Sequence, residues 1–403
     1  MRGSMSLRVY YVAAFAVGGV YLPFFPRWLE ARGMHGFELG LVAAASPAMG
    51  VLAPAAFGAM SDTLGLRGGL LQIVCLGALV SWGSLTVAAA LGVPLGLVTL
   101  LAAALALALF RAPMILLADL TAIEGARSVG TSYGRHRLWG SVGFLGAVLV
   151  AARFVDPRTV MPFPVVISGG LCAALLASLG IPARAELHRR GDRHGARELL
   201  AYPDFKTFLV AAFLGQCAHA SYDLCFTLYL FDLGSSRNAV GLAWAIGTGC
   251  EVVLMASAAR AFRAFPPASL LALALGAAAL RWAIIASVHS LPVLLLLQPL
   301  HALSFGLMWI SAVAYAQQQT PARSLGTAQG LLATAFGAGS VTGMLLWGAA
   351  YHRGGGALVF ASAAGIAACA SACALTLTEC VRRRSRKRRA RESSVPPPSA
   401  ARA

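Results

Sequence analysis

The chain has 403 residues, of which 58% are hydrophobic and only 12% are charged. Soluble proteins carry about 25% charged residues, so this composition excludes an ordinary soluble domain. The net charge of +17 does not indicate nucleic-acid binding, because most of the 32 Lys and Arg residues lie between apolar segments or at the end of the chain.

Apolar segments follow one another along the whole chain, and each is about 20 residues long, enough to cross a bilayer as a helix. Backbone polar groups must be satisfied internally in lipid, so we predict an all-α integral membrane protein with twelve transmembrane helices. The predicted spans are 9–29, 38–60, 69–91, 94–118, 138–155, 162–181, 207–231, 238–259, 268–289, 292–317, 325–350 and 355–380.

A charged segment, residues 183–206, separates six predicted spans from the other six. This even division predicts two six-helix halves, residues 1–182 and 207–381, around a central cavity, which is a common plan in secondary transporters. Residues 382–403 begin with a run of arginines and end in a Pro/Ser/Ala-rich stretch, so we expect a basic, disordered tail.

The basic residues indicate the orientation of the chain. They gather on the side of the two termini, and the positive-inside rule therefore predicts that both termini are cytoplasmic, in a multi-pass protein of a bacterial inner membrane. The run from Arg382 to Arg389 is expected to lie beside anionic lipids. A partner-binding role of this run is the alternative.

Prolines inside the predicted spans indicate kinks or breaks, because proline removes a backbone donor from a helix. They are Pro23, Pro26, Pro47, Pro54, Pro113 and Pro299. Small residues at one-turn spacing, Gly140, Gly143 and Gly146, predict close approach of the fifth span to a neighbouring helix.

Between the second and third spans, residues 58–67 read GAMSDTLGLR. This segment resembles the major facilitator superfamily signature G-x-x-x-D-x-x-G-x-[R/K], and the resemblance implies a latch for one conformation made by Gly58, Asp62, Gly65 and Arg67. An acid at a helix end can pair with a basic residue or with a helix N-terminus. The corresponding loop of the second half, residues 260–267, lacks the Asp and the Gly, so a second latch is not expected.

Two further runs narrow the resemblance. Residues 133–144 read YGRHRLWGSVGF and residues 21–26 read YLPFFP, which resemble the phenylpropionate permease-like and lactose permease-like branch of that superfamily. In those relatives an acid at the end of the fourth helix pairs with the second Arg of the fifth-helix run. The resemblance therefore implies that Asp119 and Arg137 bind substrate. A structural ion pair is the alternative.

The second half places ionisable residues on four consecutive spans. Tyr222 and Asp223 match a Tyr-Asp pair of the same relatives, and Glu251, Arg281 and His301 align with the buried cluster that couples protons there. Charged residues in membrane spans are costly and mark functional sites by default. We therefore predict proton coupling by these five residues, with a buried structural network as the alternative.

This cluster departs from the lactose carrier at two positions. Ser304 stands where that carrier has an acid one turn after its histidine, and Gln298 stands where it has a basic residue one turn before. If symport occurs, the proton carrier must then be Glu251, Asp223 or His301. The run LHALSFG, residues 300–306, resembles the phenylpropionate permease-like branch, so both departures belong to that branch.

Three more residues are candidates for substrate binding. Arg111 lies about 12 Å deeper than Asp119, at 1.5 Å per helical residue, and could attract a substrate carboxylate or pair with an acid. Trp139 and Phe144 are candidate stacking groups. For the aromatic residues, packing or a place at the membrane interface is the alternative.

These features predict a secondary transporter that imports a small organic solute with protons, either an aromatic carboxylate or a sugar or nucleoside. The alternatives are a drug or metabolite exporter of the same fold and a membrane sensor. Exporters usually carry Gly-Pro in the fifth span, and this chain does not. The chain also lacks the HExxH, GxSxG and P-loop motifs, so we expect no enzymatic activity, cofactor or metal. A functional monomer is expected.

Overall fold

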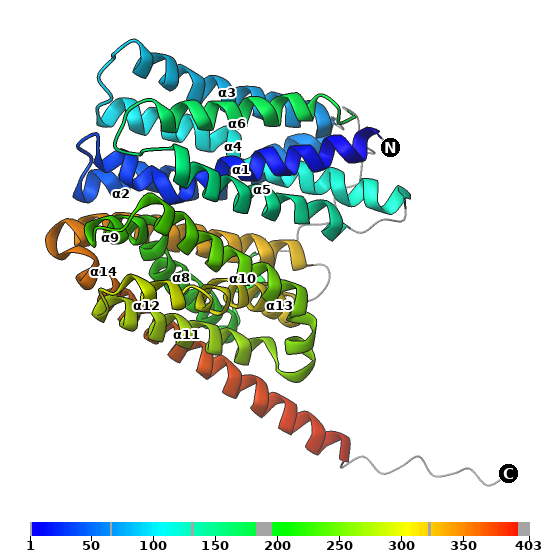
Figure 1. Ribbon diagram of the computed structural model, residues 1–403. Helices are drawn as coiled ribbons and strands as arrows, with labels where there is room; N and C mark the ends of the chain where they lie inside the picture. Colours follow the sequence, from blue (N-terminus) through cyan, green and yellow to red (C-terminus); the bar gives the residue numbers. More distant parts are fainter. Residues whose placement is uncertain (1, 65–66, 130–132, 183–195, 321–323, 394–403) are drawn as a thin grey trace, which may run out of the picture.

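The computed structural model describes residues 2–64, 67–129, 133–182, 196–320 and 324–393. Within these ranges the chain is helical, with no strand, as predicted. Among the described residues, eight helices are long and apolar enough to cross a membrane by length and composition, with α14 counted once. Figure 1 shows the helices side by side in two groups, α1 to α6 above and α8 to α14 below.

The first group contains six helices that correspond to the first six predicted spans. They are α1 (Arg2–Glu30), α2 (Gly36–Leu64), α3 (Arg67–Ala90), α4 (Leu97–Val129), α5 (Tyr133–Phe154) and α6 (Pro162–Ser178). Helix α6 begins with a proline at its first position, where the missing N–H costs no intrahelical bond.

The second group is more irregular. After the short helix α7 (Ala196–Leu199) it contains α8 (Pro203–Ser221), η1 (Tyr222–Phe226), α9 (Thr227–Asp232), α10 (Arg237–Ala264), α11 (Pro267–Ser287), α12 (Leu291–Leu296), η2 (Ala302–Leu307), α13 (Met308–Gln319) and α14 (Leu325–Ser393). The segments η1 and η2 are π-helical, so the seventh and tenth predicted spans are each divided. The Ser236 side chain caps α10 by accepting from the Ala239 amide at 3.2 Å.

The eleventh and twelfth predicted spans share the label α14 but form two helices, and the chain turns back between them (Figure 1). Gly354 and Gly355 have non-helical backbone angles, and Gly355 has φ 61° and ψ −162°. This region of conformational space is essentially restricted to glycine. Two residues therefore replace the loop that the sequence predicted between the last two spans.

Five of the six prolines lie inside continuous helices, Pro23 and Pro26 in α1, Pro47 and Pro54 in α2, and Pro113 in α4. Neighbouring helices can satisfy the carbonyls that a proline leaves free in a membrane bundle, which explains why these helices continue. Only at Pro299, between α12 and η2, does the helix break as predicted.

The two groups contact each other at the end opposite the chain termini (Figure 1). Helix α2 packs against α14, where a side chain on Gly40 would overlap the Met344 carbonyl. Helix α5 packs against α10 through Gly241, and the Arg27 guanidinium lies 5.5 Å from the Phe231 ring centroid. One buried hydrophobic core continues from the first group into the second, and a second core lies within α8 to α14.

The contact between α1 and α5 gives a direct test of this packing. A Cβ on Gly143 would overlap the Val12 carbonyl, whereas a Cβ on Gly146 of the same helix would meet nothing within 4 Å. Gly143→Ala should lower the unfolding free energy in detergent by about 1–3 kcal/mol, the usual cost of overpacking. Gly146→Ala should leave it unchanged or raise it by up to about 1 kcal/mol. Equal effects of the two substitutions would contradict the close contact.

Candidate functional site

Arg281 lies at the centre of a buried polar cluster in the second group. Its side chain comes from α11, is fully buried, and reaches residues on three other segments. The guanidinium donates to Gln298 Oε1 at 2.9 Å and to Ser304 Oγ at 3.1 Å. It also lies 3.3 Å from His301 Nδ1 and stacks over the Tyr222 ring at 4.6 Å. The cluster therefore holds one cation among neutral hydrogen-bonding groups.

The two positions that depart from the lactose carrier are direct partners of this arginine. Gln298 accepts from Arg281 and also from the Tyr222 hydroxyl at 3.1 Å, while its own amide donates to the Leu294 carbonyl at 2.6 Å. Ser304 occupies the opposite side of the guanidinium. Because both of these partners are uncharged, they do not neutralise the positive charge of Arg281. That charge can therefore stabilise the ionised form of a nearby carboxylate.

Glu251 of α10 reaches this cluster through His301. Its Oε2 lies 3.6 Å from His301 Nε2, and its side chain is 17% exposed. Gly306 makes room for it, because a Cβ there would approach Glu251 Cγ to 2.9 Å. Since Arg281 lies against Nδ1 of His301, the histidine presents its other ring nitrogen to Glu251. The predicted grouping of Glu251, Arg281 and His301 is therefore present as a chain of contacts.

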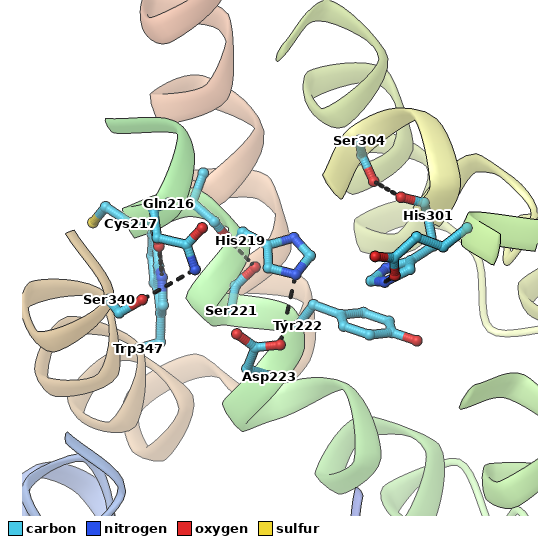
Figure 2. A network of polar contacts seen from close by, with 12 residues as sticks. Gln216, Cys217, His219, Ser221, Tyr222, Asp223, His301, Ser304, Ser340 and Trp347 are labelled. Carbon is cyan, nitrogen blue, oxygen red and sulfur yellow. Dashed lines mark hydrogen bonds and ion pairs between the residues drawn. The ribbon is translucent and has the colours of Figure 1, made fainter. Parts of the chain in front are cut away.

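Asp223 has a different histidine as its neighbour. Figure 2 shows His219 reaching toward Asp223, with 3.6 Å between Nε2 and Oδ1. His219 is 3% exposed, stacks on Phe305 at 4.5 Å, and lies 5.4 Å from the His301 ring. Sequence reasoning did not select His219, although its spacing of four residues from Asp223 places both on one face of a helix.

The two π-helical segments lie where these residues are placed. The segment η1 carries Tyr222 and Asp223, and η2 begins directly after His301 and carries Ser304. Such turns are rare and occur frequently at functional sites. The helix irregularity therefore coincides with the polar cluster in both segments.

Asp119 and Arg137 form the pair predicted in the first group. Arg137 Nε lies 4.0 Å from Asp119 Oδ1, and the Tyr11 hydroxyl donates to the same oxygen at 2.6 Å. The Arg137 guanidinium stacks over Phe15 at 4.0 Å. Both side chains are only partly buried, at 26% and 35% exposure.

Of the other predicted residues in the first group, some pack against neighbouring helices and one is exposed. Phe144 packs against α1, within 3.7 Å of the Cβ position of Gly18, and Trp139 is 41% exposed. Gly58 packs on α4, where a Cβ would lie 3.4 Å from Leu116.

The rest of the predicted latch is outside the described residues. Gly65 falls in an undescribed range, and the side chains of Asp62 and Arg67 are likewise undescribed.

Arg111 of α4 has an unusual environment for a partly buried cation. It donates to Ser46 Oγ at 3.1 Å and lies 5.5 Å from the Tyr21 ring centroid. No carboxylate within the described part of the chain forms an ion pair with it. The sequence left open a pairing with Asp119 or Asp223, and the structure instead gives Arg111 a serine and an aromatic ring.

A cavity of about 180 Å³ lies between the two helix groups. Its walls come from α1, α2, η1 and α14, and they combine an aromatic surface with polar side chains. The lining residues are Tyr21, Leu22, Phe25, Pro26, Ala43, Ser46, Pro47, Asp223, Leu224, Ser340 and Met344. Tyr21 and Phe25 stack at 4.2 Å. Asp223 thus faces the cavity, while Asp119, Arg137, Trp139 and Phe144 are not among its lining residues.

The described residues contain no group of three or more His, Cys, Asp or Glu side chains arranged to hold a metal ion.

Comparisons with known proteins agree with these features. A model of the MFS_1 like family matches residues 4–362. A protein of Escherichia coli (strain K12) described as a probable 3-phenylpropionic acid transporter is 26% identical over 313 residues, which cover 76% of this chain and 80% of that protein. The maltose permease of Geobacillus stearothermophilus is 29% identical over 329 residues, with 80% of each protein covered.

Solved structures give the same fold. Two crystal structures of the nucleoside transporter NupG match with TM-scores of 0.81 and 0.75 at 15% identity. The matches cover 93% and 94% of this chain and 99% of the nucleoside transporter in both cases. At this identity the likeness shows the shared fold.

Proposed function

The chain belongs to the MFS_1 like family and is a secondary transporter, not an enzyme, and from this premise we propose that it imports a small aromatic carboxylate together with protons. The observation that carries the substrate class is the partly buried Arg111, which donates to Ser46 of the cavity wall. A cation that has no ion-pair partner among the described residues is costly where it is shielded from water, and a bound carboxylate would supply the missing charge. The stacked rings of Tyr21 and Phe25 offer a surface for an aromatic ring on the cavity wall.

The size of the cavity supports a solute with one ring. Pockets for drug-sized ligands have volumes of roughly 300–1,000 Å³. The cavity here, at about 180 Å³, is smaller, which favours a single-ring acid over a disaccharide. The relatives described as a phenylpropionic acid transporter and a maltose permease represent these two substrate classes, so both belong in the test.

We assign proton coupling to the contact between Glu251 and His301. Glu251 is mostly buried and lies 3.6 Å from His301, which in turn contacts Arg281. Burial disfavours a charged carboxylate, while a nearby arginine favours it. A small shift of Arg281 relative to Glu251 would therefore change the protonation state, which is the property that a coupling group needs.

The membrane arrangement completes the proposal. Residues 1–182 and 207–381 form the two halves, both termini are cytoplasmic, and the basic tail lies against anionic lipid. The contacts at the end opposite the termini then describe a state closed on the outer side, and the predicted latch that includes Asp62 acts on the cytoplasmic side. The transporter works as a monomer.

Uptake into proteoliposomes with an imposed pH gradient tests the function. Labelled 3-phenylpropionate, maltose and a nucleoside should be offered in parallel, with the gradient present, absent and reversed. Gradient-dependent accumulation of the aromatic acid alone is expected. Accumulation of maltose or the nucleoside instead would contradict the substrate class, and efflux driven by an inward proton gradient would indicate the exporter.

Arg111→Gln tests the residue that carries the proposal. The substitution removes the charge but keeps a donor that can reach Ser46, so the affinity for 3-phenylpropionate should fall about 10- to 100-fold, the usual value of a hydrogen bond to a charged group. Arg153→Gln, at the exposed end of α5, is the matched control and should leave affinity unchanged. Equal binding by the Arg111 variant and the wild type would exclude the carboxylate role.

A further inference from the structure

Asp223 is a carboxylate on the cavity wall that lacks a hydrogen bond among the described residues. Its side chain is 22% exposed, it lines the cavity, and its nearest polar partner is His219 Nε2 at 3.6 Å, beyond hydrogen-bonding distance. A mostly buried carboxylate normally accepts several hydrogen bonds, and leaving it without them is costly. Asp223 therefore presents its carboxylate as a hydrogen-bond acceptor to the cavity.

The opposite wall of the cavity presents donors. Ser46 accepts from Arg111 at 3.1 Å, so the hydroxyl proton of Ser46 remains available to a bound solute. Arg111 of α4 lies behind this wall and polarises the hydroxyl of Ser46 by its hydrogen bond. The cavity thus offers a donor on α2 and an acceptor on η1, with the Tyr21 and Phe25 rings of α1 also on its wall.

We infer that the solute carries, in addition to its carboxylate, a second polar group that donates a hydrogen bond to Asp223, a hydroxyl or an ammonium. This inference rests on the proposed function and makes its substrate class narrower. The carboxylate binds at Ser46 and Arg111, the ring lies against Tyr21 and Phe25, and the donor group reaches Asp223.

His219 is the positioning residue for this carboxylate. It is buried among Phe305, Tyr222 and His301, and its Nε2 lies 3.6 Å from Oδ1 of Asp223. Its packed ring therefore restrains the carboxylate, whose side chain still lines the cavity. The charged groups nearest to this arrangement are Arg281, whose guanidinium lies on the far side of His301 and Tyr222, and Glu251 beyond His301.

A solute of this kind would also connect the two helix groups. Ser46 and Tyr21 belong to the first group, and Asp223 belongs to the second. A ligand that contacts both stabilises the conformation in which the two walls are close, because a ligand shifts an equilibrium only by its differential affinity for the two states.

Equilibrium binding to the purified full chain in lipid nanodiscs tests the inference with three probes. They are 3-phenylpropionate, its ring-hydroxylated analogue and its α-amino analogue. We expect at least one donor-bearing probe to bind about tenfold or more tightly than the plain acid. Comparing the hydroxylated probe with the amino probe shows whether a hydroxyl or an ammonium group donates to Asp223.

Variants of the chain then show which residues cause the preference for a donor-bearing probe. Asp223→Asn should reduce the affinity ratio between donor-bearing and plain probe to below about threefold, whereas Glu379→Gln, at an exposed carboxylate far along α14, should keep the ratio. His219→Leu should lower the ratio, and His219→Gln, which retains a donor near Asp223, should restore it. A general loss of folding changes both affinities together and leaves the ratio unaltered.

The outcomes separate the two proposals. Equal affinity for all three probes overturns the second polar group and leaves the aromatic carboxylate in place. No binding of any probe overturns both. A ratio that survives in Asp223→Asn overturns the role of Asp223, and unchanged ratios in both His219 variants overturn the positioning role.

Discussion

Proteoliposomes that contain the Glu251→Gln variant should exchange the solute across the membrane but should not accumulate it when a proton gradient is imposed. Glutamine has the shape of a protonated glutamate and keeps contact with His301, so the transport cycle can continue. It cannot release a proton, so the cycle no longer depends on the gradient. We expect gradient-driven accumulation to fall at least about tenfold, which corresponds to 1.4 kcal/mol of lost driving force.

The matched control is Glu379→Gln, because Glu379 is 52% exposed and pairs only with the neighbouring Arg383 among the described contacts. This variant should accumulate the solute like the wild type. Uphill transport by Glu251→Gln would move the coupling role to Asp223 or His301.

Neutralising either member of the Asp119 and Arg137 pair should abolish solute transport. Each single variant, Asp119→Asn or Arg137→Gln, leaves an uncompensated charge in a partly buried site, and Asp119→Asn also weakens the bond from Tyr11. The double variant distinguishes the two interpretations of the pair. If the pair binds solute, the double variant stays inactive; if it is only a structural ion pair, neutralising both partners restores transport.

Membrane insertion and thermal unfolding in detergent are the controls for these three variants. Equal melting temperatures with lost transport support the binding role. Wild-type transport by either single variant would show that the contact at 4.0 Å is dispensable.

Much of the helical arrangement could be predicted because it depends on local composition. Length and hydropathy are sufficient to place spans such as α3 and α4. A helix satisfies its own backbone hydrogen bonds, which a bilayer cannot do for an apolar segment. The breaks were less predictable. Pro299 coincides with a break while Pro113 does not, because tertiary packing decides whether a proline's free carbonyl finds another partner.

Part of the candidate functional site could be predicted from the sequence. Charged residues within spans are rare, so Asp119, Arg137, Glu251 and Arg281 could be selected individually, and spacing in relatives suggested the first pair. The resemblance predicted the grouping of Glu251 with Arg281 and His301, whereas the order of contacts within it depends on helix rotation, which composition does not reveal.

Neutral polar residues were the main omission. Ser46, Ser340 and Gln216 line or support the cavity, with Gln216 donating to Ser340 at 3.0 Å. Serine and glutamine are common in membrane helices for packing reasons, so a single sequence cannot distinguish those that face a cavity. His219 had a usable signal in its spacing from Asp223, which becomes convincing only when the π-helical segment η1 is seen.

Gly354 and Gly355 form the joint between the helix of α14 that packs on α2 and the helix that follows it. Glycine has no Cβ and adopts many backbone angles, so this joint lets the two helices change their angle. That following part carries Phe360, whose ring lies 5.8 Å from Trp282, the neighbour of Arg281 in α11. The joint can therefore absorb a separation of α2 from the first helix of α14 while Phe360 stays packed against Trp282 beside Arg281.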